Sequence, residues 1–280
     1  MIIWVASYPR SGNSLVMSLL WNLCGYRTSS VFDEAKDIDN EKLYNAYGYE
    51  RLTYTKFAYW MLDQKPHFIK THNACSDSLP AIYVVRDGRD VICSMAHFNI
   101  TMGRTTLGFE DELHRCITNK GFSWSRRVLW WARKRALFAP TAIVKFEDLI
   151  ESPISTLCGA LEKLRIPIDI HGIPPKFDEL HKIEPRQFRK GQVGEWKEEM
   201  SEGLQEDFWS LHWDAMKELG YEWKLCKSQN SSPARYVEQK QPELQASLLN
   251  ALVSGLGAVA LNMENDTISN LLDGRVGIWS

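Results

Sequence analysis

The sequence lacks any strong excess of one charge. Its 33 Lys and Arg residues nearly balance its 35 Asp and Glu residues, which gives a formal net charge of −2. Proteins that hold nucleic acid or an anionic membrane over a broad surface carry a clear positive excess, so neither partner is indicated here. Any anionic ligand must instead be held by a local cluster of cations.

Patterns typical of metal sites and disulfide frameworks are also missing. The six cysteines stand apart along the chain, at Cys24, Cys75, Cys93, Cys116, Cys158 and Cys226. They form no C-x-x-C pair and no Cys/His spacing typical of zinc. A chain of 280 residues buries enough apolar surface to fold without disulfides. We therefore expect reduced cysteines, no metal and a cytoplasmic location.

No long hydrophobic run predicts a signal peptide or a membrane span. The apolar start, residues 2–6, is shorter than a signal-peptide core and no basic residue precedes it. The nearest candidate for a span, residues 244–261, contains several polar side chains. Its leucines recur at every fourth position, which favours an amphipathic helix.

Short apolar segments alternate with helical segments along most of the chain. The segments that predict buried strands are residues 2–6, 68–71, 81–85 and 141–146. Helices are expected from about residues 15 and 91, and across 123–138. This alternation is typical of an α/β fold with a parallel sheet covered on both faces. Ligands of such sheets bind beyond the carboxyl ends of the strands. The polar turns after the first three strands should therefore lie together around one binding site.

The composition changes at residues 227–233, a polar stretch that indicates a linker. We therefore divide the chain into a domain over residues 1–225 and a C-terminal linker with a helical extension over 226–280. The role of this extension is not indicated by its residues.

The first polar turn, Tyr8–Ser14, joins a predicted strand to a helix. A glycine-containing turn at a helix N-terminus directs several backbone N–H groups toward one point, where phosphate or sulfate oxygens fit. Ser14 adds a hydroxyl and Arg10 a permanent cation. The turn is not a Walker A loop, which requires G-x-x-x-x-G-K-[ST]. Taken alone, it is equally compatible with an ordinary turn that carries a surface arginine.

The turn after the third strand places an arginine and a hydroxyl at the start of a helix. Arg86 closes the strand and Ser94 lies eight residues later, an arrangement that suits a terminal phosphate. Asp90 is expected to cap the helix. For Arg89 we favour a surface salt bridge with Asp87 or Asp90.

A third basic segment lies far along the chain. Arg189 and Lys190 stand next to Gly191 within Phe188–Trp196, as in a loop that folds over an anion. A solvated charge pair is the commoner role for two such neighbours.

In combination, these segments resemble the PAPS-dependent sulfotransferase family over roughly residues 2–223. Five motifs of the family occur in the family's order, at Tyr8–Ser14 (5′-phosphosulfate loop), Lys70-Thr71-His72 (K-T-H), Arg86 with Ser94 (3′-phosphate motif), Phe146–Leu149 (Y-E-D-L) and Arg189–Trp196 (R-K-G-x-x-G-[DE]-W). The resemblance implies a P-loop-like three-layer sandwich with a central parallel sheet. It also implies transfer of a sulfuryl group from 3′-phosphoadenosine-5′-phosphosulfate (PAPS) to a hydroxyl or amine of a small-molecule or carbohydrate acceptor, by in-line displacement and without a metal.

The resemblance assigns roles to individual residues. The implied catalytic residues are His72 as general base, Arg10 on the leaving phosphate and Lys70 on the sulfuryl oxygens. The implied donor-binding residues are Arg10, Ser11, Gly12, Asn13, Ser14, Leu15, Arg86, Ser94, Phe177, Arg189, Lys190 and Gly191. An imidazole titrates near neutral pH, which suits a group that must take a proton from the acceptor.

Some positions depart from the family pattern. Leu15 stands where many members stack a tryptophan on the adenine, whereas Phe177 resembles the second stacking position. Phe146 replaces the tyrosine of Y-E-D-L. Glu202 replaces a valine in the dimerisation pattern of some animal members, so we infer no dimer and leave the oligomeric state open.

Other interpretations remain at this point. A nucleotide-dependent kinase has a related fold but needs a Walker A lysine and a metal-holding acid, and a non-catalytic nucleotide-binding relative should lack the base. The segment Trp124–Arg135 has the aromatic and basic content of a nucleic-acid site, but its spacing favours a core helix with cations on the solvated face. The acceptor, expected to meet residues 32–65 and 99–122, is not identified.

Overall fold

The computed structural model describes residues 1–32, 40–185 and 188–223. The chain divides into two compact units, Met1–Trp223 and Lys224–Ser280. The second unit lies outside the described residues. The predicted linker, the leucine stripe of residues 244–261 and the helical extension therefore lie outside them too, and the division at residue 225 stays a prediction.

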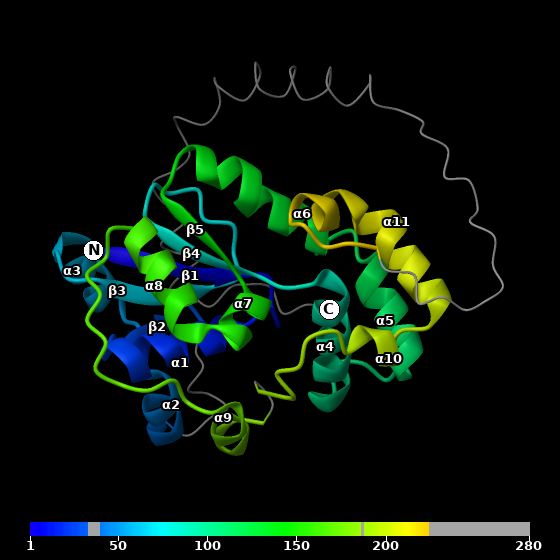
Figure 1. Cartoon of the computed structure of the whole chain (residues 1–280), viewed down its shortest axis with the longest axis horizontal. Coiled ribbons are helices and arrows are strands. Elements are labelled where there is room, and N and C mark those ends of the chain that lie inside the picture. The colour runs from blue at the N-terminus through cyan, green and yellow to red at the C-terminus, as the bar shows by residue number, and fades with distance from the viewer. Residues whose placement is uncertain (33–39, 186–187, 224–280) are drawn as a thin grey trace. The chain divides into compact units, whose positions relative to one another are not determined.

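Strands and helices alternate along the first unit (Figure 1). The strands are β1 (Ile2–Ser7), β2 (Thr28–Ser30), β3 (His67–Thr71), β4 (Ala81–Val85) and β5 (Thr141–Lys145). The α-helices are α1 (Asn13–Cys24), α2 (Asn40–Tyr47), α3 (Tyr54–Leu62), α4 (Gly88–Thr101), α5 (Phe109–Thr118), α6 (Trp124–Leu129), α7 (Phe146–Glu151), α8 (Pro153–Lys163), α9 (Phe177–Ile183), α10 (Trp196–Glu199) and α11 (Glu202–Glu218). Helix α6 continues as a π-helical segment, η2 (Trp130–Lys134), and a 3₁₀ turn, η3 (Arg135–Leu137).

The five strands form one sheet in the order β2-β3-β1-β4-β5, and every neighbouring pair is parallel. All four predicted strands are confirmed. The fifth, β2, was not predicted, because its three residues Thr-Ser-Ser carry no apolar pattern.

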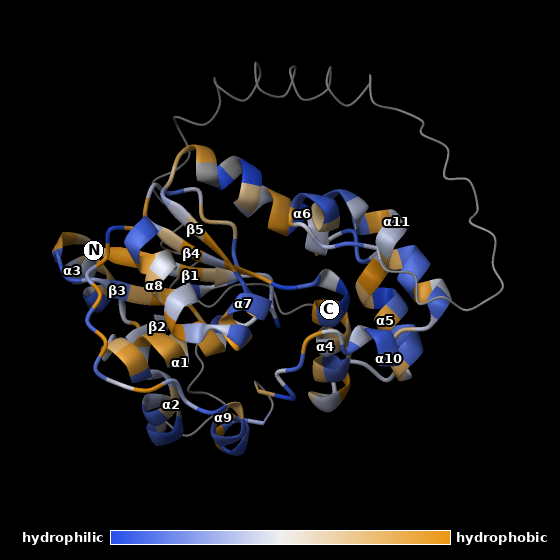
Figure 2. Ribbon diagram, viewed as in Figure 1, coloured by the Kyte–Doolittle hydropathy of each residue, from blue (hydrophilic) through white to orange (hydrophobic). Residues whose placement is uncertain are grey.

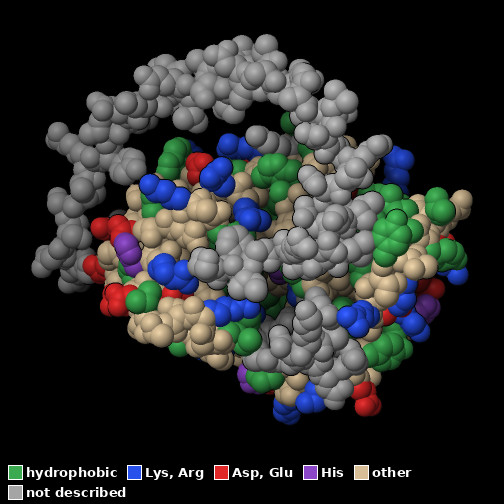
Figure 3. All heavy atoms as spheres, turned by 180° about the vertical axis from the view of Figure 1, so that it is seen from behind, with side chains coloured by type: hydrophobic (Ala, Val, Ile, Leu, Met, Phe, Trp, Pro, Cys, Tyr) green, Lys and Arg blue, Asp and Glu red, His purple; other side chains and the backbone are tan. Residues whose placement is uncertain are grey.

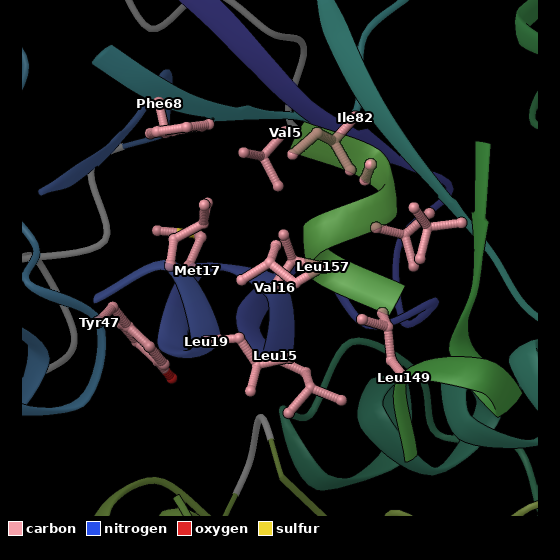
Figure 4. Packing of buried hydrophobic residues seen from close by; sticks show 14 of the residues in the cluster. Val5, Leu15, Val16, Met17, Leu19, Tyr47, Phe68, Ile82, Leu149 and Leu157 are labelled. Carbon is pink, nitrogen blue, oxygen red and sulfur yellow. The ribbon is translucent and has the colours of Figure 1, made fainter. Parts of the chain in front are cut away.

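Helices cover both faces of the sheet. Val5 and Ile82 point to one face, where they pack with Val16 of α1 and Leu157 of α8 (Figure 4). Successive side chains of a strand point to opposite faces, so their neighbours meet the second layer of helices. There Tyr83 stacks on Trp131 of η2 at a centroid distance of 4.8 Å. The strands are apolar while the outer helices are largely polar (Figure 2). The predicted three-layer α/β architecture is confirmed.

The basic, tryptophan-rich segment after residue 123 is only partly as predicted. Trp124 and Trp131 are buried, as expected for a core helix. The expectation that its cations lie on the solvated face is wrong for Arg135, which is fully buried. Its guanidinium donates to Leu79 O at 2.5 Å and to Thr141 Oγ1 at 3.0 Å, so main-chain and hydroxyl acceptors replace water.

Basic side chains on the face shown in Figure 3 lie in several separate groups rather than in one continuous patch. Of the helices in the described part of the chain, none is long and apolar enough to span a bilayer.

Candidate anion-binding and active site

The polar turns that follow β3, β1 and β4 lie at one edge of the sheet. Because these strands are adjacent and parallel, their carboxyl ends are brought together, as predicted. Residues 65 positions apart in sequence are neighbours there, since Ala6 pairs with Thr71 across the sheet.

The turn between β1 and α1 has an unusual backbone. Arg10 (φ 69°) and Gly12 (φ 110°) both adopt left-handed conformations. A Cβ at Gly12 would lie 2.6 Å from Cδ2 of Phe146, so this position requires glycine. Ser11 is buried, and its Oγ has no hydrogen-bond partner among the described residues. The turn is therefore a close-packed feature and not an ordinary surface loop.

Asn13 attaches the start of α1 to the sheet. Its Nδ2 donates to Val5 O at 3.1 Å and to Thr71 O at 3.2 Å. The side chain thus connects α1 to the ends of β1 and β3. Asn13 is also one of the predicted donor-binding residues. Its backbone amide lies in the first turn of α1, where N–H groups have no acceptor within the helix.

His72 lies directly beyond β3 and faces the end of β1. Its Nδ1 is 3.0 Å from Ser7 O, and its ring stacks on Phe32 at a centroid distance of 5.3 Å. A carbonyl oxygen accepts only, so Nδ1 carries the proton and a neutral ring has its lone pair on Nε2. Arg127 Nη1 donates to His72 O at 3.1 Å and fixes the backbone of this residue. Lys70 lies two residues earlier, buried in β3.

Arg10 extends from the first turn toward α4. Its Nε donates to Ser94 Oγ at 3.2 Å, and its guanidinium lies 4.8 Å from the ring centroid of Phe98. Burial, together with the charges of Arg86 and Arg189, lowers the pKa of Arg10 to about 10. Three arginines from three distant segments therefore share one electrostatic neighbourhood.

Arg86 is buried at the end of β4. Its Nη2 donates to Gln192 O at 2.9 Å and lies 3.7 Å from Asp90 Oδ2. The guanidinium also lies 4.4 Å from the ring centroid of Phe146. Its Nε is buried without a partner among the described residues, and so retains a donor for a ligand.

Asp90 does not cap α4, contrary to our expectation. Asp87 is the cap and accepts from Arg89 N at 3.0 Å. The Asp90 carboxylate instead accepts from Gly194 N at 2.8 Å and from Trp196 N at 3.0 Å. Asp90 lies inside the first turn, so its side chain faces the neighbouring loop while Asp87 reaches the helix N–H groups.

Arg89 forms the predicted ion pair with Asp87, at 2.7 Å. The pair is buried rather than on the surface, because the guanidinium packs 3.7 Å from the ring centroid of Trp196. This contact and the bonds of Asp90 fasten the loop after α9 to α4.

The basic pair of that loop is engaged by acidic side chains. Arg189 pairs with Glu195 and, at 3.2 Å, with Glu199; Lys190 Nζ lies 3.1 Å from the same Glu199. Glu195 is the acidic position of the R-K-G-x-x-G-[DE]-W motif but was given no role, and Glu199 was not singled out from the sequence. The alternative of a simple solvated charge pair therefore does not describe these residues, because both are paired with acids, although the Lys190 side chain is 46 % exposed.

The two predicted adenine contacts lie in different surroundings. Gly191 (φ 65°) lies against Phe177 so closely that a Cβ would be 2.3 Å from its ring. The structure thus brings Phe177 and the basic loop together. Leu15 is buried in the apolar cluster under the sheet and only 7 % exposed.

No cluster of three or more metal-ligating side chains occurs within residues 1–32, 40–185 and 188–223. The five cysteines of this part of the chain are free thiols in the structure.

Comparison with known proteins defines the class to which this site belongs. Residues 2–169, more than half of the chain, match the sulfotransferase domain family. The chain therefore belongs to the sulfotransferase family of enzymes. No curated protein matches the sequence significantly.

Solved structures share the fold of this chain. The mouse sulfotransferase SULT7A1, complexed with PAP, superposes with a TM-score of 0.53 at 19 % identity, over 77 % of this chain and 83 % of that chain. Retinol dehydratase, in complex with androsterone and the inactive cofactor PAP, gives a TM-score of 0.52 at 16 % identity, over 79 % and 82 % of the two chains. At these identities the likeness establishes the fold.

Proposed function

We propose that this enzyme transfers a sulfuryl group from PAPS to a hydroxyl or amine of a small-molecule or carbohydrate acceptor in the cytoplasm. One observation carries the proposal. Arg10 bonds to Ser94 of α4, and Arg86 bonds to Gln192 in the loop that carries Arg189. Three arginines from separate segments thus lie at the end of the sheet that carries His72. A nucleotide with phosphates at both its 3′ and 5′ positions requires two such cationic regions beside each other.

The turn Tyr8–Ser14 is proposed to hold the 5′-phosphosulfate. The amides of Ser11 to Ser14 precede or open α1, where the helix dipole favours an anion. Ser11 Oγ, buried without a partner among the described residues, supports the presence of a ligand oxygen at this position.

The 3′-phosphate is proposed to lie between α4 and the basic loop. Arg86, Ser94, Arg189, Lys190 and the amide of Gly191 form this set. The buried, unsatisfied Nε of Arg86 supports it. Phe177 is proposed to stack on the adenine, and its closeness to Gly191 supports this assignment. Because Leu15 lies in the core, only its backbone is expected to approach the donor.

The proposed reaction is a direct displacement at sulfur. The acceptor O–H gives its proton to His72 Nε2 while its oxygen forms a bond to sulfur. The bond from sulfur to the bridging oxygen breaks, and its electron pair stays on the 5′-phosphate. Arg10 stabilises that charge and Lys70 faces the sulfuryl oxygens. The contact of Arg10 with Ser94 supports a second task for this arginine, which is to link the two phosphate regions.

Nucleotide preference tests the proposal. We expect 3′-phosphoadenosine 5′-phosphate (PAP) at 100 times its Kd to stabilise the folded chain by roughly 2.7 kcal/mol. At the same concentration, adenosine 5′-phosphate (AMP) or ATP with magnesium should stabilise the folded chain much less, as measured by thermal denaturation. A larger effect of ATP with magnesium would contradict the proposal and favour a kinase. A screen for transfer of radiolabelled sulfate from PAPS to extract fractions identifies the acceptor, and binding of PAP without transfer would favour a non-catalytic relative.

A further inference from the structure

Glu199 is a carboxylate within the cation cluster proposed to hold the 3′-phosphate. Its Oε1 accepts from Arg189 Nη1 at 3.2 Å and from Lys190 Nζ at 3.1 Å, and its Oε2 lies 3.1 Å from His97 Nε2. Two cations assigned to the phosphate therefore already share an anion that belongs to the chain itself.

Glu199 is held in this place by its helix. In the short helix α10, Trp196 N donates to Asp90 and the Trp196 ring packs on Arg89, so the helix is attached to α4. Burial opposes ionisation of Glu199, but hydrogen bonds and charge from Lys190 and Arg189 outweigh it and lower the pKa of this carboxyl. The side chain is therefore ionised at neutral pH.

Two other carboxylates lie near these cations, and they differ from Glu199 in what they hold. The Asp90 side chain is 0 % exposed and accepts two backbone N–H groups, so its displacement would detach the loop. Glu195, 6 % exposed, pairs with Arg189. Glu199 is 16 % exposed and its bonds are to side chains. A phosphate can replace Glu199 at Lys190, whose side chain is 46 % exposed, without breaking any backbone bond.

We propose that Glu199 sets the affinity and selectivity of the enzyme for the 3′-phosphate, an inference that rests on the proposed function. Before the donor binds, Glu199 acts as the counter-ion of Arg189 and Lys190. When the donor binds, the 3′-phosphate takes over these cations and remains close to a carboxylate of like charge. Glu199 thereby weakens binding of every 3′-phosphorylated nucleotide, which includes the spent product PAP, and speeds its release.

The size of the effect follows from Coulomb's law. Two like charges about 6 Å apart near a protein surface repel strongly enough to change a binding constant by about tenfold or more, even after partial screening by salt. A nucleotide without the 3′-phosphate does not meet this repulsion. The effect of Glu199 should thus depend on that one phosphate.

The test compares Glu199→Gln with Glu198→Gln in the full-length chain. Glu198 is the exposed neighbour in the same helix, and its change removes the same charge from a side chain without these partners. Titration calorimetry measures the Kd of PAP and of AMP for both variants and the wild type. We expect Glu199→Gln to tighten PAP binding about tenfold, to leave AMP binding within twofold and to slow the release of PAP in stopped-flow experiments. Glu198→Gln should change each value by less than about twofold.

Unchanged or weaker PAP binding by folded Glu199→Gln would overturn the inference and make Glu199 a support that positions the two cations. Equal tightening by both variants would overturn it too, since only general surface charge would then matter. If Glu199→Gln does not fold, Glu199→Asp withdraws the carboxylate by one methylene and should tighten PAP binding by a smaller factor. Failure of the wild type to bind PAP would instead contradict the proposed function.

Discussion

The two sides of the proposed donor site are held together by different forces. On the side of β1 and β3, amide and ring N–H groups bond to main-chain carbonyls. Asn13 reaches Val5 O and Thr71 O, and His72 reaches Ser7 O. Such bonds have strict geometry and little dependence on salt, so they suit groups that must be oriented.

On the side of β4 and α4, charged groups dominate. Arg86 meets Asp90, whereas Arg189 and Lys190 meet Glu199. The exposed pair of Lys190 and Glu199 can exchange partners at small cost, because each charge accepts another counter-ion, whereas the pair of Arg86 and Asp90 is buried. The comparison supports our proposal that one side orients the reacting atoms, whereas the other side holds the cations that bind a phosphate. Rate and affinity should therefore be separable by mutation.

The sharpest test of this separation is His72→Ala. Loss of the proposed general base is expected to lower the transfer rate about 10²- to 10⁴-fold, because the group proposed to take the acceptor's proton is then missing. The Kd of PAP should stay within about twofold, since the base lies on the side that orients. His171→Ala, which removes an exposed histidine, is the control and should leave both values unchanged. A loss of PAP binding as large as the loss of rate would break the comparison.

The second test changes the charged side. Arg86→Ala should weaken PAP binding about 10- to 100-fold, the usual cost of losing a charge-assisted hydrogen bond in a partly buried site. AMP binding should change by less than about threefold, because the lost contact belongs to the 3′-phosphate. Calorimetry at low and high salt measures both values, with the exposed Lys163→Ala as the control. Equal weakening for both nucleotides would make Arg86 a mere support for the loop through Gln192.

The smallest expected effect is a loss of stability at acidic pH, and it concerns the side of β1 and β3. His212 is buried, with Nδ1 3.0 Å from Ser125 Oγ and Nε2 3.2 Å from Ile117 O. Its bond to Ser125 anchors α6, the helix that carries Arg127 and thereby supports His72. Burial lowers the pKa of His212 below 6.5, so the folded state keeps the ring neutral. The unfolded chain takes up the proton at higher pH, and stability is therefore lost as the pH falls through about 6.5 toward the folded-state pKa.

Urea denaturation at pH 7.5 and 5.5 measures this loss in the free energy of unfolding. The wild type should lose more stability on acidification than His212→Gln, which has no proton to gain at this position. Identical losses in both proteins would assign the pH dependence to other groups and would remove His212 from the comparison.

Much of the fold was predictable because its signals are local. A buried strand between two layers of helices is apolar along its whole length, so β1, β3, β4 and β5 are visible in the sequence. Parallel strands then place their polar turns at one edge of the sheet, which predicts that these turns surround one binding site. The short polar strand β2 and the break of the helix after residue 129 have no such signal.

The sequence by itself determined four of the five strands, the order of the motifs and the family. Only the tertiary structure decided how the charges pair. Asp90 holds Gly194 and Trp196 across more than 100 residues, and His97 meets Glu199 across 102. A repeating apolar pattern indicates which face of a helix or strand is buried, and it can be recognised in the sequence alone. An ion pair depends on the distance between two side-chain tips, and that distance exists only after remote elements have packed.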